Sequence, residues 1–143
     1  CSMLIRTSVF DQIGMFDEAY GPAYFEEMDL ERRIRASGGK IYLVPSSRIG
    51  HFEKGSALES AVLKQQYKRN EIYFHLTDPR HSFLQNIINT LKLFREHAVQ
   101  SYAKSGRMDV RANTQAIIWN FFRLPKTWQT WRNHYLIKTT RKL

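Results

Sequence analysis

Residues 23–44, AYFEEMDLERRIRASGGKIYLV, carry the pattern that decides the fold of this chain. Leu30 and Ile34 lie one helical turn apart, and charged residues occupy the positions around them. This spacing predicts a helix from Glu26 to about Ser37, which the following glycine pair ends because glycine readily leaves the helical conformation. The three carboxylates at its start are Glu26, Glu27 and Asp29.

The segments on either side of this helix predict strands. Residues 1–6 (CSMLIR) and 40–44 (KIYLV) are short runs rich in β-forming residues. Residues 7–13 predict a short helix. We expect the two strands to lie side by side and the 26–37 helix to cross them, because its apolar stripe must be buried against another element.

The remainder of the chain has helical periodicity. A capping box at Ser56–Glu59 predicts a helix that runs to about Leu76, and Asp78 is expected to cap the next one. Two further helical runs cover 108–122 and the stretch after Pro125. The sequence therefore predicts an α/β segment at residues 1–56, followed by a helical region at residues 57–143.

Charge divides the chain in the same place. Residues 1–56 hold seven Lys/Arg and eight Asp/Glu, whereas residues 57–143 hold 15 and five. The basic half could face nucleic acid, anionic lipid or a phosphorylated substrate. No helix-turn-helix, zinc or RNA-recognition signature is present, so a nucleic-acid-binding module is the weakest of these alternatives, and we expect no nucleic-acid partner.

Cysteine content and hydropathy bear on the compartment. The single cysteine cannot form an internal disulfide, and no apolar run approaches the 18 or so residues needed to cross a bilayer. We expect a reducing, cytoplasmic environment. The chain starts at Cys1 on a strand-like run, which suggests a piece of a longer protein.

Three motifs in fixed order point to a family. They are IGMFDE at 13–18, YFEEMDLERRIRASGGKIYLVP at 24–45 and RIGHFEKGS at 48–56. Together with the helix up to about residue 76, they resemble the C-terminal half of family 2 glycosyltransferases of the GT-A type, particularly the bacterial rhamnosyltransferase-like members. The resemblance implies the C-terminal part of a GT-A fold. The nucleotide-binding half of that family, with its Asp-x-Asp metal motif, precedes the matching segment.

The resemblance also implies a reaction. Such enzymes transfer a sugar with inversion from a nucleotide-sugar donor to a saccharide or lipid-linked acceptor, as in surface polysaccharide or glycolipid synthesis. By resemblance, Glu27 is the general base that accepts the acceptor's hydroxyl proton, although the family usually has Asp there. Glu26 would orient the site, and Asp29 would act there or hold the helix through Arg33. Acids are also favoured at any helix N-terminus, so a solvated helix face is the alternative.

The remaining site residues follow from the same resemblance. Asp17, Glu18, Arg33 and Arg69 are expected to bind substrate, and His51 is expected to bind a divalent metal, Mn²⁺ or Mg²⁺, together with the Asp-x-Asp half. Glu27 and His51 should then border one cleft, since a base and a metal flank the same reacting centre.

The last 21 residues, 123–143, leave a further alternative open. They hold six bases and no acid, with Trp128, Trp131 and Tyr135 on one helix side. This pattern suits the interface of an anionic membrane, but it also suits packing against the preceding helices. A non-catalytic adaptor that binds a membrane or a partner is therefore the rival to the enzyme.

Overall fold

The computed structural model describes residues 3–50, 60–105 and 110–140, and every regular element within these ranges is helical. The elements in chain order are α1 (Thr7–Ile13), the 3₁₀-helix η1 (Glu18–Tyr20), α2 (Glu26–Ala36), α3 (Ser60–Leu76), α4 (Phe83–Ser105), α5 (Val110–Phe122) and α6 (Leu124–Thr140).

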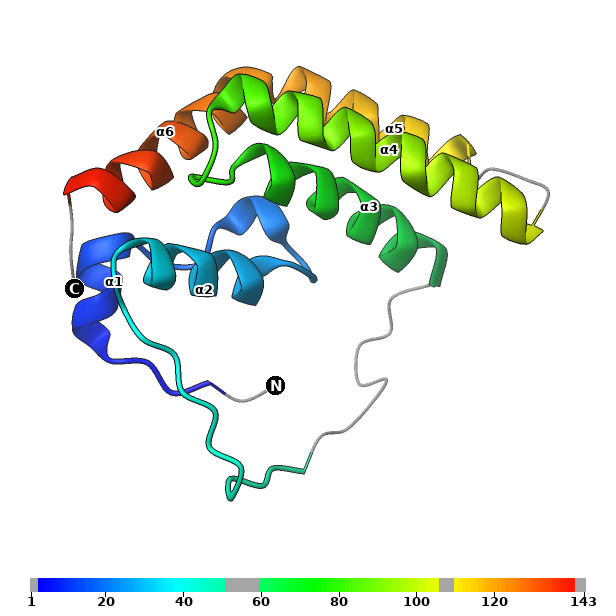
Figure 1. Ribbon diagram of the computed structural model, residues 1–143. Coiled ribbons are helices and arrows are strands. Elements are labelled where there is room, and N and C mark those ends of the chain that lie inside the picture. The colour runs from blue at the N-terminus through cyan, green and yellow to red at the C-terminus, as the bar shows by residue number, and fades with distance from the viewer. Residues whose placement is uncertain (1–2, 51–59, 106–109, 141–143) are drawn as a thin grey trace.

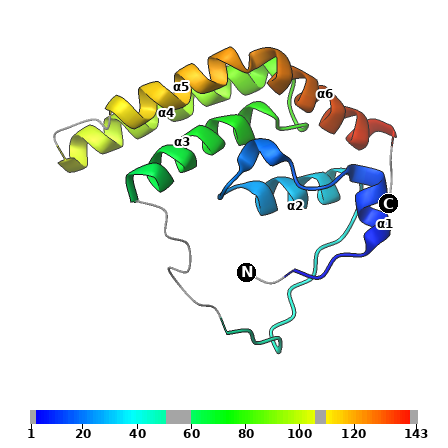
Figure 2. The same cartoon turned by 180° about the vertical axis from the view of Figure 1, so that it is seen from behind.

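Helix α3 lies at the centre of the arrangement. It contacts α4, α5 and α6, and both views place it between α2 and the layer that contains α4 and α5 (Figures 1 and 2). Helix α2 packs against α6 and α1. Helix α2, early in the chain, is therefore held between α1 and the last helix of the described residues.

Three apolar clusters fill the contacts between these helices. The first joins α1 to α2, the second joins the loop before α2 to α3, and the third joins α3 to α5. Their buried members are Ile13, Leu30 and Ile34; Tyr20, Phe25 and Tyr73; and Ile72, Leu76 and Ala116.

The helices follow the predictions closely. The 7–13 and 26–36 helices appear as expected, and Leu30 and Ile34 are buried, which confirms the predicted inner face of α2. The predicted helix ending at Leu76 is confirmed, and the helix predicted after Pro125 is present but already begins at Leu124. The predicted capping box at residues 56–59 lies outside the described residues.

The two predicted strands are wrong for the residues described. Neither 3–6 nor 40–44 forms a strand, and Leu4 and Leu43 are almost fully exposed. Ile5 and Ile41 do pack on the same α1–α2 cluster, so both segments reach the helix as expected. A strand requires a hydrogen-bonded partner, and the described residues pair neither segment. The GT-A fold stays a prediction.

The start of α4 also differs from the prediction. Ser82, not Asp78, precedes this helix, and its hydroxyl accepts a hydrogen bond from the Gln85 N–H at 3.2 Å. The Asp78 carboxylate is instead bound by the backbone N–H and guanidinium of Arg80. Because Asp78 supports the 77–82 turn through Arg80, it is not free to cap a helix.

Candidate functional site

The loop that leads into α2 is held by one side chain of α3. The amide of Asn70 donates hydrogen bonds to the carbonyl oxygens of Tyr20, Ala23 and Tyr24, at 2.7, 2.8 and 2.9 Å. Asn70 is fully buried. A buried donor and three backbone acceptors thereby satisfy one another, which fixes the course of the loop.

Two neighbours of Asn70 on α3 bind the same loop. Gln66 donates to the Tyr20 carbonyl, and the Arg69 guanidinium donates to the Gly21 carbonyl at 2.8 Å. Arg69 also lies over the Trp119 ring, 4.5 Å from its centroid. Burial, with a smaller contribution from Arg123, lowers the Arg69 pKa. Arg69, predicted to bind substrate, is thus seen here as a support of the loop.

The backbone entering α2 is strained. Tyr24 and Phe25 have φ angles of 75° and 74°, a left-handed conformation that is costly for aromatic residues. Phe25 occupies the N-cap position and supplies no side-chain hydrogen bond to the helix. The first N–H groups of α2, which like those of any helix have no intrahelical acceptor, therefore receive no hydrogen bond from an N-cap side chain. Such strained, pinned segments occur preferentially at functional sites.

The two glutamates that follow have different surroundings. The Glu27 side chain is exposed, whereas Glu26 is half-buried and its Oε2 has no hydrogen-bond partner among the described residues. Of the three predicted catalytic acids, Glu27 is the one most open to a dissolved acceptor. Its position on α2 is set by the pinned loop on one side and by Asp29 on the other.

Asp29 is buried in a cluster of cationic side chains. Its carboxylate accepts hydrogen bonds from Arg32 at 2.7 Å and Arg33 at 2.9 Å, and His134 Nδ1 lies 3.9 Å away. Burial raises the pKa of the Asp29 carboxyl, but the charges of Arg32 and Arg33, and of His134 when it is protonated, bring that pKa below its ordinary value. Asp29 is fully buried, which suits the helix-holding role and not contact with substrate.

Arg33 connects α2 to the segment after α1. Besides Asp29, its guanidinium donates to the carbonyl oxygens of Ile13, Gly14 and Met15, at 2.8, 3.2 and 2.8 Å. Arg33 is 2% exposed. Four of its five N–H groups are used within the protein, so the geometry places it in support of the fold and not at a substrate surface.

Asp17 and Glu18 lie at η1. The Asp17 carboxylate caps η1 through the Ala19 N–H at 2.9 Å and accepts a hydrogen bond from the Tyr73 hydroxyl at 2.8 Å. Glu18 is exposed. Asp17 therefore links the 13–18 motif to α3, while Glu18 is the member of the pair that is open to a ligand.

The predicted metal ligand cannot be placed. His51 lies outside the described residues, so its predicted approach to Glu27 also falls outside them. Among the residues the structure describes, no three His, Cys, Asp or Glu side chains gather as a metal site would require. The described side chains alone do not fit a bound divalent ion, and no step is assigned to one.

Sequence reasoning missed Gln66 and Asn70. Both are polar residues four positions apart within a helix, and Asn70 directly follows the predicted Arg69. A polar pair with i,i+4 spacing on a helix's inner face is a signal for such a role. Their acceptors, 46 to 50 positions earlier in the chain, carry no matching signal.

Comparison with known proteins gives partial similarities. No family model matches the chain, and no solved structure matches it. The chain is 30% identical over 59 residues to inactive polypeptide N-acetylgalactosaminyltransferase-like protein 5 of Macaca fascicularis, covering 41% of this chain and 13% of that protein.

A second similarity covers more of the chain. It is 34% identical over 80 residues to N-acetylglucosaminyl-diphospho-decaprenol L-rhamnosyltransferase of two Mycobacterium tuberculosis strains, covering 56% of this chain and 25% of that protein. The chain thus spans a quarter or less of the length of these curated relatives. The similarities support a glycosyltransferase-like relationship over about half of the chain.

Proposed function

We propose that this chain contributes the acceptor side of an inverting glycosyltransferase, with Glu27 as the general base. The donor would be a nucleotide-sugar and the acceptor a saccharide or a lipid-linked saccharide. The rhamnosyltransferase similarity supports a lipid-linked acceptor, because that relative's name specifies a decaprenol carrier.

The observation that carries the proposal is the placement of Glu27. It is an exposed carboxylate in the first turn of a helix whose preceding loop is pinned by Asn70 and strained at Tyr24 and Phe25. A general base must sit within hydrogen-bond reach of the proton it accepts, about 2.6–3.2 Å between heavy atoms. A fixed helix start supplies that positional control.

The other predicted site residues take supporting roles in this proposal. Asp29 and Arg33 are positioning residues that hold α2, Arg69 and Asp17 position the loop and η1, and Glu26 and Glu18 remain available to orient an acceptor. His51 is the proposed ligand for Mn²⁺ or Mg²⁺, in a site that would need further carboxylates.

A transfer assay with matched variants tests the base. The release of nucleoside diphosphate is measured over a panel of nucleotide-sugars with saccharide and prenyl-diphosphate-linked acceptors. Glu27→Gln keeps the side-chain shape but removes the proton acceptor, so turnover should fall about 100-fold or more. Donor affinity should change little, because the lost interaction forms only during proton transfer.

Glu96→Gln, at an exposed glutamate of α4, is the matched control and should leave transfer unchanged. If Glu27→Gln keeps near-normal transfer activity and Glu26→Gln loses it, the general base is Glu26 and not Glu27. Asp29→Asn is not informative as a base test because that carboxylate is buried with two arginines. If neither glutamate variant affects transfer, the proposed general base is wrong and these acids only stabilise the N-terminus of α2.

An exposed apolar surface favours membrane contact as a second role. Phe121 and Phe122, at the end of α5, are 65% and 78% exposed, and Lys126 follows them on α6. Trp131 packs instead against Phe83. Across the parts of the chain that the structure describes, no helix has the length and hydropathy to traverse a bilayer. We propose a peripheral contact at the cytoplasmic face of the membrane.

Vesicle flotation tests this second role. Binding to vesicles that contain phosphatidylglycerol should fall when Phe121 and Phe122 are both replaced by Ser, because burial of aromatic side chains supplies interfacial affinity. The variant Leu84→Ser, at an exposed apolar residue of α4, is the control. Equal flotation of both variants would exclude the α5 end as the membrane contact.

A further inference from the structure

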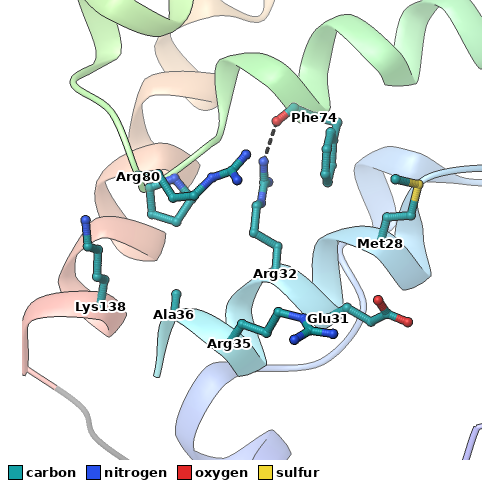
Figure 3. Close-up of a pocket in the computed structure, with 9 residues that line it drawn as sticks. Met28, Glu31, Arg32, Arg35, Ala36, Phe74, Arg80 and Lys138 are labelled. Atoms are coloured by element: carbon teal, nitrogen blue, oxygen red, sulfur yellow. Dashed lines mark hydrogen bonds between the residues drawn. The ribbon is translucent and has the colours of Figure 1, made fainter. Parts of the chain in front are cut away.

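A groove of about 440 Å³ lies on the side of α2, between this helix, the end of α3 with the turn that follows it, and the last turns of α6 (Figure 3). It starts at Met28, the residue after the proposed base. The lining residues are Met28, Glu31, Arg32, Arg35, Ala36, Phe74, Pro79, Arg80 and Lys138.

Positive charge is in excess in this groove. Arg35 and Lys138 are exposed, and neither has a carboxylate within ion-pair distance among the described residues. Arg80 is paired with Asp78 at 2.6 Å. Glu31 is the one carboxylate among the lining residues.

Buried arginine side chains beneath the groove add to this excess of positive charge. Arg32 lines the groove and shares the Asp29 carboxylate with Arg33, so two guanidinium groups face one carboxylate. His134 does not add a fixed charge, because burial lowers its pKa. The floor of the groove is therefore also cationic.

The groove has an apolar end as well. In Figure 3, Lys138 and Arg80 lie on one side of Arg32, and Phe74 and Met28 lie on the other. The Arg32 guanidinium covers the Phe74 ring at 4.1 Å from its centroid. That ring face is not free to stack on a nucleobase, whereas its edge and Met28 can contact an alkyl chain.

We propose that this groove binds a phosphate ester that carries an apolar chain. The phosphate would lie between Lys138 and Arg80, since arginine and lysine bind phosphate oxygens through charge-assisted hydrogen bonds. Arg35, whose side chain extends toward Glu31 in Figure 3, adds to the positive charge of the groove. The chain would run along Phe74 and Met28. This inference does not depend on sugar transfer, and the groove needs no metal.

Matched ligands test the two halves of the proposal. Octyl phosphate, octyl glucoside and inorganic phosphate are titrated into the isotope-labelled chain, and amide chemical shifts are followed by NMR. Octyl phosphate should bind at least about tenfold more tightly than inorganic phosphate, since burial of two methylene groups alone corresponds to about this factor. It should also bind more tightly than octyl glucoside, which has the same chain but no charge for the cations to bind. The shifts should map to α2, the 77–82 turn and the end of α6.

Charge variants test the assignment of residues. Arg80→Gln combined with Lys138→Gln should weaken octyl phosphate binding about tenfold, because both cations lose their contact with the phosphate. Glu31→Gln should tighten it, since it removes the repelling carboxylate. Lys92→Gln, at an exposed lysine of α4, should have no effect. Circular dichroism verifies that each variant keeps its helices.

Three results would overturn the proposal. Inorganic phosphate that binds as tightly as octyl phosphate would make the groove a free-phosphate site. Equal binding of octyl glucoside would remove the role of the cations. Unchanged octyl phosphate binding in the double variant would place the ligand elsewhere. None of these results depends on transferase activity, so the proposed function can fail or hold independently.

Discussion

Arg33 and Arg35 are two positions apart on α2, yet their surroundings are opposite. Arg33 is buried and bound to Asp29 and three backbone carbonyls, whereas Arg35 is exposed. Arg33→Gln should lower the free energy of unfolding by about 3 kcal/mol, because it leaves a buried carboxylate short of a partner. Arg35→Gln should change it by less than about 0.5 kcal/mol. Urea denaturation of both variants measures the contrast.

A comparable result for both variants would mean that Arg33 is more hydrated than its burial indicates. Arg33→Lys sharpens the test. Lysine keeps the charge but cannot reproduce the planar set of donors that reaches Asp29 and the carbonyls after α1, so it should restore only part of the lost stability.

Asn70 is the second residue whose environment makes a quantitative prediction. Asn70→Ala removes the donor to three loop carbonyls at once and should destabilise the fold by about 2 kcal/mol or more. Asn133→Ala, at an exposed asparagine of α6, is the matched control. Because the loop leads directly to Glu27, Asn70→Ala should also reduce transfer more than it reduces helix content. Urea denaturation and the transfer assay provide the two readings.

At the scale of elements, the start of α4 shows how a turn can override a local signal. Ser82→Ala removes the hydroxyl that accepts from Gln85 and should cost about 1 kcal/mol of stability. Ser82→Asp keeps a capping oxygen and should remain near the parent protein. Thermal denaturation compares the two. Equal loss in both variants would show that the capping oxygen is not what stabilises the start of α4.

Asn86 also stabilises this end of α4, because its side chain binds the helix to the end of α3 and the turn that follows. Its buried amide donates to the carbonyl oxygens of Leu76 and Asp78, at 3.1 and 2.8 Å. The turn between the helices is thus fixed from within α4. Pro79, also buried there, forms part of the groove proposed to bind a phosphate ester.

At the scale of the whole molecule, acid should weaken the fold through His134. This histidine joins α6 to the α2 cluster, and burial, followed by opposing effects of Asp29 and the two arginines, leaves its pKa below 6.5. The unfolded chain then binds more protons than the folded one as pH falls below about 6.5. Stability should therefore fall with acidification, by at most about 1.4 kcal/mol per pH unit from this group.

Unfolding free energies from pH 8 to pH 5 measure this dependence. His134→Gln should flatten the slope, whereas His81→Gln, at an exposed histidine, is the control. Burial also lowers the pKa of His75, which changes stability with pH in the same direction. The unfolding free energy of His134→Gln should therefore still depend on pH, but less steeply. A slope that is identical in all three proteins would show that folding does not lower the pKa of His134.

The sequence by itself determined the helices of this protein. Their hydrogen bonds join residues four apart, so periodicity at Leu30 and Ile34, the glycines after α2 and the proline at the start of α6 are sufficient local signals. The Asp29–Arg33 pair was predictable for the same reason, since i,i+4 side chains share a helix face.

Only the tertiary structure decided which residues act together across the chain. The Asn70 contacts join residues 46 to 50 positions apart, and the groove combines α2 with Arg80 and Lys138. Such contacts depend on how helices pack and leave no local pattern. The strands failed for the complementary reason: β-propensity at 3–6 and 40–44 describes a preference, but a strand forms only where a second backbone supplies its hydrogen bonds.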